Sequence, residues 1–143
     1  MRLVLLAAAV ALLAACRPVP PPPNPLADTT WELQALVQDG DSLTQGDGLP
    51  ADLLRFEADY GFRSRSCNNC VGTYVLSDLH VVVRGLACTR RACPTEVLEL
   101  DRYVAGRAGY RLSPGELVLR VDDPINGIDA RLYFAPAAPG VWE

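Results

Sequence analysis

The amino-acid sequence predicts a mainly β fold with one α-helix: a small antiparallel β-barrel-like domain, or a strongly curled sheet, closed by one helix. Three observations support this prediction. Apolar side chains recur at every second position over most of the chain, as in strands with one buried face. Turn residues separate these segments at short intervals. The 143 residues, 50% of them hydrophobic, suffice for one domain with a single core.

The first fifteen residues have the pattern of an export signal. Arg2 precedes an apolar run, Leu3–Ala15, that is too short to span a bilayer. Cys16 follows directly, and Leu13-Ala14-Ala15-Cys16 resembles the bacterial lipobox, in which the cysteine is lipidated after cleavage. We therefore expect a lipoprotein signal peptide over 1–15 and a lipid anchor on Cys16. An ordinary signal peptide followed by a chance cysteine is the alternative.

Residues 16–28 are expected to form the lipidated cysteine and a tether. Their sequence is CRPVPPPPNPLAD, and such proline-rich chain adopts stiff, extended polyproline II. A PxxP ligand for a partner domain is the alternative. Arg17 stands where an aspartate would favour retention at the inner membrane. We therefore expect an exported protein, anchored in the cell envelope on the periplasmic side of the outer membrane if the host has one.

The first half of the folded domain, expected over residues 29–136, contains three predicted strands. They lie near residues 30–37, 54–56 and 62–66. The third is expected to be exposed, because arginines alternate with Phe62 and two serines. On the first strand, the residues expected to share one apolar face are Trp31, Leu33, Ala35 and Val37.

The second half of the domain contains a predicted hairpin and two further clear strands. Residues 74–76 and 79–83 flank Ser77-Asp78, which predicts a tight turn. Residues 117–121 and 128–134 alternate on either side of a turn-rich segment. We expect seven or eight strands in all, and a tail over 137–143 in which Trp142 docks on the domain or remains free.

One segment has helical periodicity instead. Pro94 suits the first turn of a helix, and Val97, Leu100 and Val104 recur at the spacing of one helical face. Either of the glycines that follow, at 106 and 109, can end it. We expect a helix of about eleven residues here.

Four cysteines remain once Cys16 is assigned to the lipid: Cys67, Cys70, Cys88 and Cys93. An even number in an exported chain indicates two disulfides, and three connectivities stay open. Redox chemistry at the C-x-x-C formed by Cys67 and Cys70 is one alternative, although such motifs normally open a helix. A zinc site of ribbon-like spacing is the other, although an oxidising exterior normally closes such thiols.

The sequence around these cysteines resembles the META domain of HslJ-like proteins. Residues 67–74, CNNCVGTY, resemble its C-N-x-x-x-G-x-Y signature, and residues 86–93, LACTRRAC, resemble its L-x-x-T-R-M-x-C stretch. Trp31-Glu32-Leu33 and Leu132-Tyr133-Phe134 fit its W-x-L start and hydrophobic end, so that the resemblance covers about residues 28–136. The motif residues that it identifies are Trp31, Asn68, Gly72, Tyr74, Thr89, Arg90 and Glu96.

The resemblance implies a disulfide pairing. Family members carry cysteines at the positions of Cys67 and Cys93, so these two are expected to pair. The additional Cys70 and Cys88 then form the second bridge. Arg91 replaces the usual methionine, so packing near the helix is expected to differ from the family pattern.

The motif itself is expected to serve structure. Asn68 can cap a turn through its side chain, and Gly72 can take a positive φ. Tyr74 can pack inward with its hydroxyl hydrogen-bonded.

The resemblance also implies an envelope protein without established catalysis, often linked to stress or antibiotic tolerance. We expect a non-catalytic lipoprotein that contacts another envelope protein. The exposed arginines proposed for this surface are Arg63, Arg65, Arg84, Arg90 and Arg91. The alternatives are a barrel that binds a small apolar ligand and, less favoured, a thiol oxidoreductase that uses Cys67 or Cys70.

Composition excludes several other functions. A net charge of −4 without a basic face argues against nucleic-acid binding. The single histidine, His80, excludes multi-histidine metal sites, and no phosphate-binding glycine loop is present. We expect no metal, no cofactor and a monomer that reaches the membrane through its N-terminal lipid.

Overall fold

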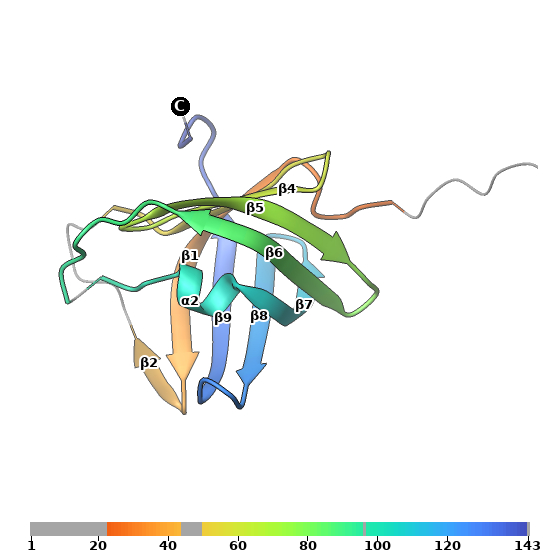
Figure 1. Ribbon diagram of the computed structural model, residues 1–143. Helices are drawn as coiled ribbons and strands as arrows, with labels where there is room; N and C mark the ends of the chain where they lie inside the picture. The colour runs from red at the N-terminus through yellow and green to blue at the C-terminus, as the bar shows by residue number, and fades with distance from the viewer. Residues whose placement is uncertain (1–22, 44–49, 96, 143) are drawn as a thin grey trace, which may run out of the picture.

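The computed structural model describes residues 23–43, 50–95 and 97–142, which form a closed antiparallel barrel (Figure 1). Eight strands close the ring through pairing of the first with the last, and β2 adds a short extension. The mainly β fold predicted from the sequence is therefore confirmed. The strands are β1 (Thr29–Gln38), β2 (Asp41–Leu43), β3 (Leu53–Phe56), β4 (Gly61–Arg65), β5 (Asn69–Leu76), β6 (His80–Cys88), β7 (Gly106–Ser113), β8 (Glu116–Asp123) and β9 (Ile128–Pro136).

The sequence analysis missed β2. Asp39 and Gly40 both have positive φ, of 53° and 89°, and join β1 to β2 as a two-residue hairpin turn. Leu36 of β1 pairs with Leu43 of β2. The described strands therefore number nine, not seven or eight.

β1 carries a β-bulge, since its register with β9 shifts between Leu33 and Ala35. Trp31 is buried before the bulge and Leu36 after it. The prediction that Ala35 and Val37 share the inner face of Trp31 is wrong, because one extra residue reverses which side of a strand faces the core.

β4 is not an exposed strand, contrary to the prediction. Phe62 is 1% exposed and Ser64 is 2% exposed. The ring of Phe62 packs edge-on against Phe56 of β3, with the ring centroids 5.4 Å apart. Barrel closure covers a strand face that is too weakly apolar to be recognised as buried from the sequence alone.

The helix is shorter than predicted. α2 (Asp101–Val104) has four residues, although Leu100 and Val104 are buried as the helical stripe implies. The chain before it loops out beyond the end of β6 and returns (Figure 1). Irregular, extended chain covers about 3.3 Å per residue against 1.5 Å in a helix, so this path favours a short helix.

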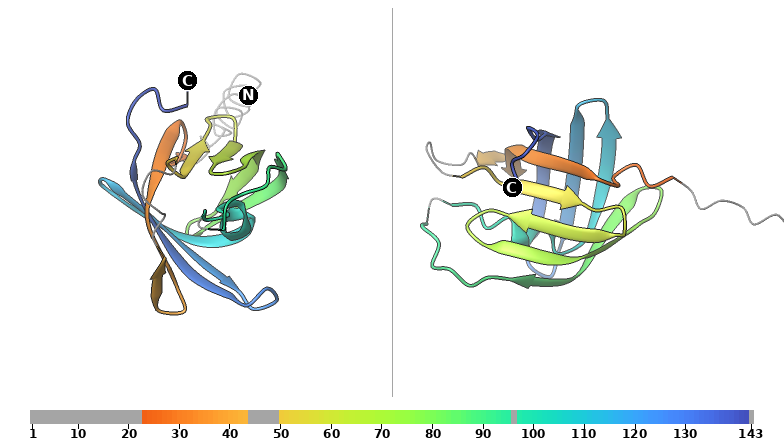
Figure 2. Two further views of the ribbon diagram at one scale, coloured as in Figure 1. Left: turned by 90° about the vertical axis from the view of Figure 1, so that its left-hand side faces the viewer. Right: turned by 90° about the horizontal axis from the view of Figure 1, so that it is seen from above.

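The two ends of the barrel differ. The β3–β4, β5–β6 and β7–β8 turns lie at one end, here termed the mouth end, because consecutive strands are antiparallel. The β4–β5 and β8–β9 turns and α2 lie at the other, the helix end. Tyr103 of α2 donates a hydrogen bond to Oε1 of Gln38, the last residue of β1, at 2.7 Å. Figure 2 shows how the sheet curls around the barrel axis, which runs from the mouth end to the helix end.

Side chains fill the interior of the barrel. Near the mouth end, the Phe56 and Tyr74 rings meet edge-on with centroids 5.0 Å apart. The buried cluster also contains Leu100 and Val104, which cover the helix end. The remaining members are Leu26, Trp31, Leu36, Leu54, Phe62, Val81, Val83, Ala108, Leu117, Leu119, Val121, Ala130, Leu132 and Phe134.

The segments directly before β1 and after β9 both pack on the barrel. Residues 24–28, which the sequence analysis places in the tether, pack onto the mouth end, and Leu26 is 0% exposed. In the tail, the Arg65 guanidinium lies 5.1 Å from the ring centroid of Trp142, which therefore docks on the domain.

The expected signal peptide over 1–15, the lipidation cysteine Cys16 and most of the tether lie outside the described residues. Within the described ranges, no helix has the length and apolar character needed to cross a bilayer.

Asp52, which directly precedes β3, is a buried carboxyl at the helix end. It is 1% exposed, and neither carboxyl oxygen has a hydrogen-bond partner. Burial raises the pKa of Asp52 to about 7 from its ordinary value of 3.8. The folded state therefore keeps this proton at pH values where the unfolded chain has lost it.

We expect the Asp52→Asn variant to lose a pH dependence that the wild type shows. Because the folded pKa is raised, the contribution of Asp52 to wild-type stability falls as pH rises from about 4 to about 7, by as much as about 4 kcal/mol, and is constant outside that window. Urea unfolding between pH 3 and 8 measures this slope. Asp122→Asn, which alters an exposed carboxylate on β8, is the matched control and should keep the wild-type slope. If the free energy of unfolding of Asp52→Asn varies with pH in parallel with that of the wild type, the raised pKa of Asp52 is contradicted.

Candidate functional site

The residues of the C-N-x-x-x-G-x-Y motif lie on or directly before β5, which runs the length of the barrel. Cys67 and Asn68 precede the strand at the helix end, Gly72 lies in its middle and Tyr74 lies near the mouth end. One strand therefore carries contacts to both ends of the domain.

At the helix end, the four cysteines form two pairs at disulfide distance. Cys67 lies opposite Cys93 with a Cα–Cα distance of 5.8 Å, and Cys70 lies opposite Cys88 at 4.0 Å. This is the pairing that the family resemblance implied. The first pair fastens the loop after β6 to the β4–β5 turn, and the second joins β5 to β6 across the sheet.

Asn68 reinforces the same junction. Its side-chain oxygen accepts hydrogen bonds from the Arg91 backbone N–H at 2.9 Å and from the Thr89 hydroxyl at 3.2 Å. Thr89 Oγ1 in turn accepts a hydrogen bond from the Asn69 backbone N–H at 3.0 Å. Asn68 thus bonds across more than 20 residues of sequence to the loop after β6, rather than capping a turn of its own as the sequence analysis expected.

This arrangement disfavours the two chemical alternatives for the cysteines. Cys67 and Cys70 belong to different pairs, so the C-x-x-C does not form a bridge of its own. In the described part of the chain, the only group with metal-ligand proximity is Cys70, Cys88 and Asp101. Two of its three members are joined to each other and offer no free thiolate.

Gly72 is needed for space and not for a positive φ, which corrects the expectation. It faces a bulge in β6 that contains Gly85, whose φ is 62°. A Cβ at Gly72 would lie 2.8 Å from the backbone oxygen of Arg84 and 3.3 Å from Cα of Leu86. Backbone atoms cannot move aside as a flexible side chain can, so only glycine fits.

At the mouth end, Tyr74 packs inward with its hydroxyl bonded, as predicted. Its Oη donates to the Glu57 backbone oxygen at 3.0 Å and accepts from Nδ2 of Asn24 at 2.6 Å. Asn24 belongs to the segment that precedes β1. Tyr74 therefore joins that segment, the β3–β4 turn and β5 at a single hydroxyl.

A cavity of about 510 Å³ opens at this end. Its walls include Tyr60, Tyr74 and Tyr110, with Leu76 and Pro25 beside them. The Tyr60 ring lies 5.5 Å from the Tyr74 ring, centroid to centroid. The sequence analysis singled out neither Tyr60 nor Tyr110. A tyrosine next to Gly61 in a turn was the one local signal, and it is too common to be diagnostic.

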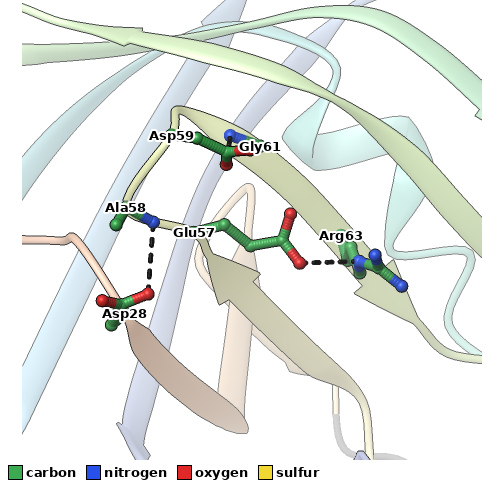
Figure 3. Close-up of polar contacts among 6 residues, drawn as sticks. All are labelled: Asp28, Glu57, Ala58, Asp59, Gly61 and Arg63. Carbon is green, nitrogen blue, oxygen red and sulfur yellow. Dashed lines mark hydrogen bonds and ion pairs between the residues drawn. The ribbon is translucent and has the colours of Figure 1, made fainter.

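Carboxylates are also found near the mouth. Asp28 accepts a hydrogen bond from the Ala58 backbone N–H at 3.2 Å, and Asp59 accepts one from Gly61 at 3.1 Å (Figure 3). Burial is the main cause that raises the pKa of the Tyr74 hydroxyl. The hydrogen bond from Asn24 lowers it, while Tyr60, Asp28 and Asp59 raise it further.

The remaining motif residues have simpler positions. Trp31 is buried and donates its indole N–H to Thr29 Oγ1 at 2.8 Å. Arg90 is exposed and forms no hydrogen bond or ion pair with the described residues. Glu96 lies outside them.

The fold and site define a small, bridged β-barrel domain whose signature residues hold its two ends together. The chain belongs to the META domain family, since the family model matches residues 24–125. An NMR structure of a protein from Burkholderia xenovorans is similar, with 27% identity, a TM-score of 0.61 and coverage of 85% of this chain and 94% of that one. A second NMR structure shares the fold at 21% identity, with a TM-score of 0.59 and coverage of 78% and 91%. No curated protein matches the chain significantly.

We expect Gly72→Ala to destabilise the domain by about 1–3 kcal/mol, because the added methyl group meets backbone atoms. The matched control is Gly109→Ala on β7, where the nearest atoms to a Cβ lie at 3.8 Å and the substitution should be neutral or slightly stabilising. Guanidinium unfolding of the two variants measures the difference. Equal stabilities would show that the close approach at Gly72 is unimportant.

Proposed function

We propose that the protein is a non-catalytic lipoprotein of the bacterial cell envelope, anchored through Cys16, whose META domain acts by binding another envelope component. The observation that carries this proposal is how the motif uses its polar side chains. Asn68, Thr89 and Tyr74 bond to groups of the domain itself, and the cysteines pair with one another. The polar groups and cysteines of the motif therefore stabilise the barrel itself. The outer surface and the mouth remain as the parts that can bind another component.

The arginine surface expected from the sequence is supported in part. Arg63 is paired with Glu57 at 2.9 Å, and Arg65 is covered by the tail. Arg84, Arg90 and Arg91 are exposed and form no ion pair with the described residues. These three, on β6 and the loop that follows it, are the part of the proposed protein-binding surface that we retain.

The proposal that the protein is involved in stress or antibiotic tolerance rests on the family alone. An outer-membrane location and a monomeric state rest on the sequence. For the small-ligand alternative, the filled interior disfavours a site deep in the barrel. The cavity at the mouth is the location that this alternative would use.

Anchoring predicts that the exported chain incorporates a labelled fatty acid and fractionates with membranes. The Cys16→Ser variant should lose the label, because the lipid is attached through that sulfur. A variant with both Cys70→Ser and Cys88→Ser is the control and should keep the label. An unlabelled wild-type chain found in the soluble periplasmic fraction supports the ordinary signal peptide instead.

If the cysteines serve structure and not thiol catalysis, the two disulfides should keep one pairing and resist mild reduction. A non-reducing peptide map, with free thiols blocked before digestion, should contain Cys67–Cys93 and Cys70–Cys88 and should be unchanged by a mild thioredoxin-like reductant. A Cys67–Cys70 bridge that is easily reduced while Cys88 and Cys93 stay paired would favour the oxidoreductase alternative.

A further inference from the structure

The cavity at the mouth has the size and composition of a ligand site. Its volume of about 510 Å³ falls within the range of roughly 300–1,000 Å³ that is usual for small-molecule pockets. Aromatic rings and aliphatic side chains form much of its wall, with hydroxyl groups from Thr73 and Ser77 beside them. Mouths of barrels are a common location for such sites.

Tyr60 gives the first indication that this wall serves recognition. Its φ is 65°, a left-handed conformation that is unfavourable for a bulky residue and natural for glycine. The turn is closed by backbone hydrogen bonds of Tyr60 N–H to Glu57 and of Glu57 N–H to Gly61, which need no aromatic side chain. Yet the side chain is a large ring that is 45% exposed beside Tyr74.

Charge gives the second indication. Asp78 is the only charged side chain among the described residues that line the cavity. Asp28 and Asp59 do not line the cavity, but both raise the pKa of Tyr74, and neither forms an ion pair in the described part of the chain. Figure 3 shows that the nearby Arg63 is directed to Glu57 and away from Asp28. The mouth is therefore aromatic and negatively charged.

We propose that the barrel mouth binds a small organic cation with an aromatic or other apolar body. The Tyr60 ring, which is 45% exposed, attracts a cation through its face, and the apolar wall holds the body. The Asp78 carboxylate in the cavity lining favours a positive ligand over a neutral or anionic one of the same shape. This inference goes beyond the proposed function, since it needs neither the lipid anchor nor a protein partner.

The probe is benzyltrimethylammonium, with benzyl alcohol and phenylmethanesulfonate as neutral and anionic analogues that share its benzyl group. The exported full chain, in nanodiscs of a zwitterionic lipid, is titrated by calorimetry against empty nanodiscs. If the chain proves not to be lipidated, the same titration is made in solution, so that failure of anchoring does not decide this question. Saturable binding of the cation, weakened by salt and at least about tenfold tighter than that of either analogue, is expected.

Two variants place the binding at the mouth. Tyr60→Gly should keep the fold, because glycine suits the turn, and should weaken cation binding about three- to fivefold. Asp78→Asn should weaken it about two- to threefold at low salt and reduce the salt dependence. The controls are Tyr133→Leu on β9 and Asp122→Asn on β8, which alter outward-facing residues and should bind as the wild type does.

Three results would overturn the proposal. The first is an analogue that binds as tightly as the cation. The second is unchanged binding by a folded Tyr60→Gly variant. The third is equal weakening by the control variants, which would place the binding elsewhere.

Discussion

The fixation of β5 at both of its ends is the constraint on which the rest of the structure depends. At the helix end, the cysteine pairs and the Asn68 amide join it to β6 and to the loop after β6. At the mouth end, the Tyr74 hydroxyl joins it to the β3–β4 turn and to Asn24. A strand held in this way fixes the spacing of its neighbours. The register between β5 and β6 brings Gly72 close to the backbone of β6, and the same pairing directs the inward side chains that fill the interior.

The sequence was sufficient for the fold class and for most strands, because period-two alternation reports directly on one-sided burial. It was insufficient where a single residue changes the geometry. The bulge after Leu33 moves burial from Val37 to Leu36, and no local property of the chain marks it. The helical stripe at Leu100 and Val104 correctly identified buried residues. It overestimated the helix because the path that the loop must cover is a property of the whole barrel.

Some residues of the candidate site could likewise be predicted from the sequence, and others could not. The motif residues of β5 could be identified because a family resemblance marks them, and the resemblance also implied which cysteines pair. Tyr60 and Tyr110 lie 50 residues apart in the sequence and line one cavity only in the folded barrel. Asp52 precedes a strand as many surface aspartates do, and only the folded chain makes it a buried carboxyl without partners. Roles that arise from long-range closure leave no local pattern.

Two features of the helix end contribute to stability with opposite sign. The loop between Cys67 and Cys93, with a sequence separation of 26, stabilises the fold by roughly 3–4 kcal/mol in the loop-entropy account of a disulfide. The cost of keeping Asp52 protonated at neutral pH is of the same order, about 4 kcal/mol. The bridge therefore offsets much of what the buried carboxyl costs. Since such bridges form and persist in oxidising compartments, full stability of this domain depends on the proposed export from the cytoplasm.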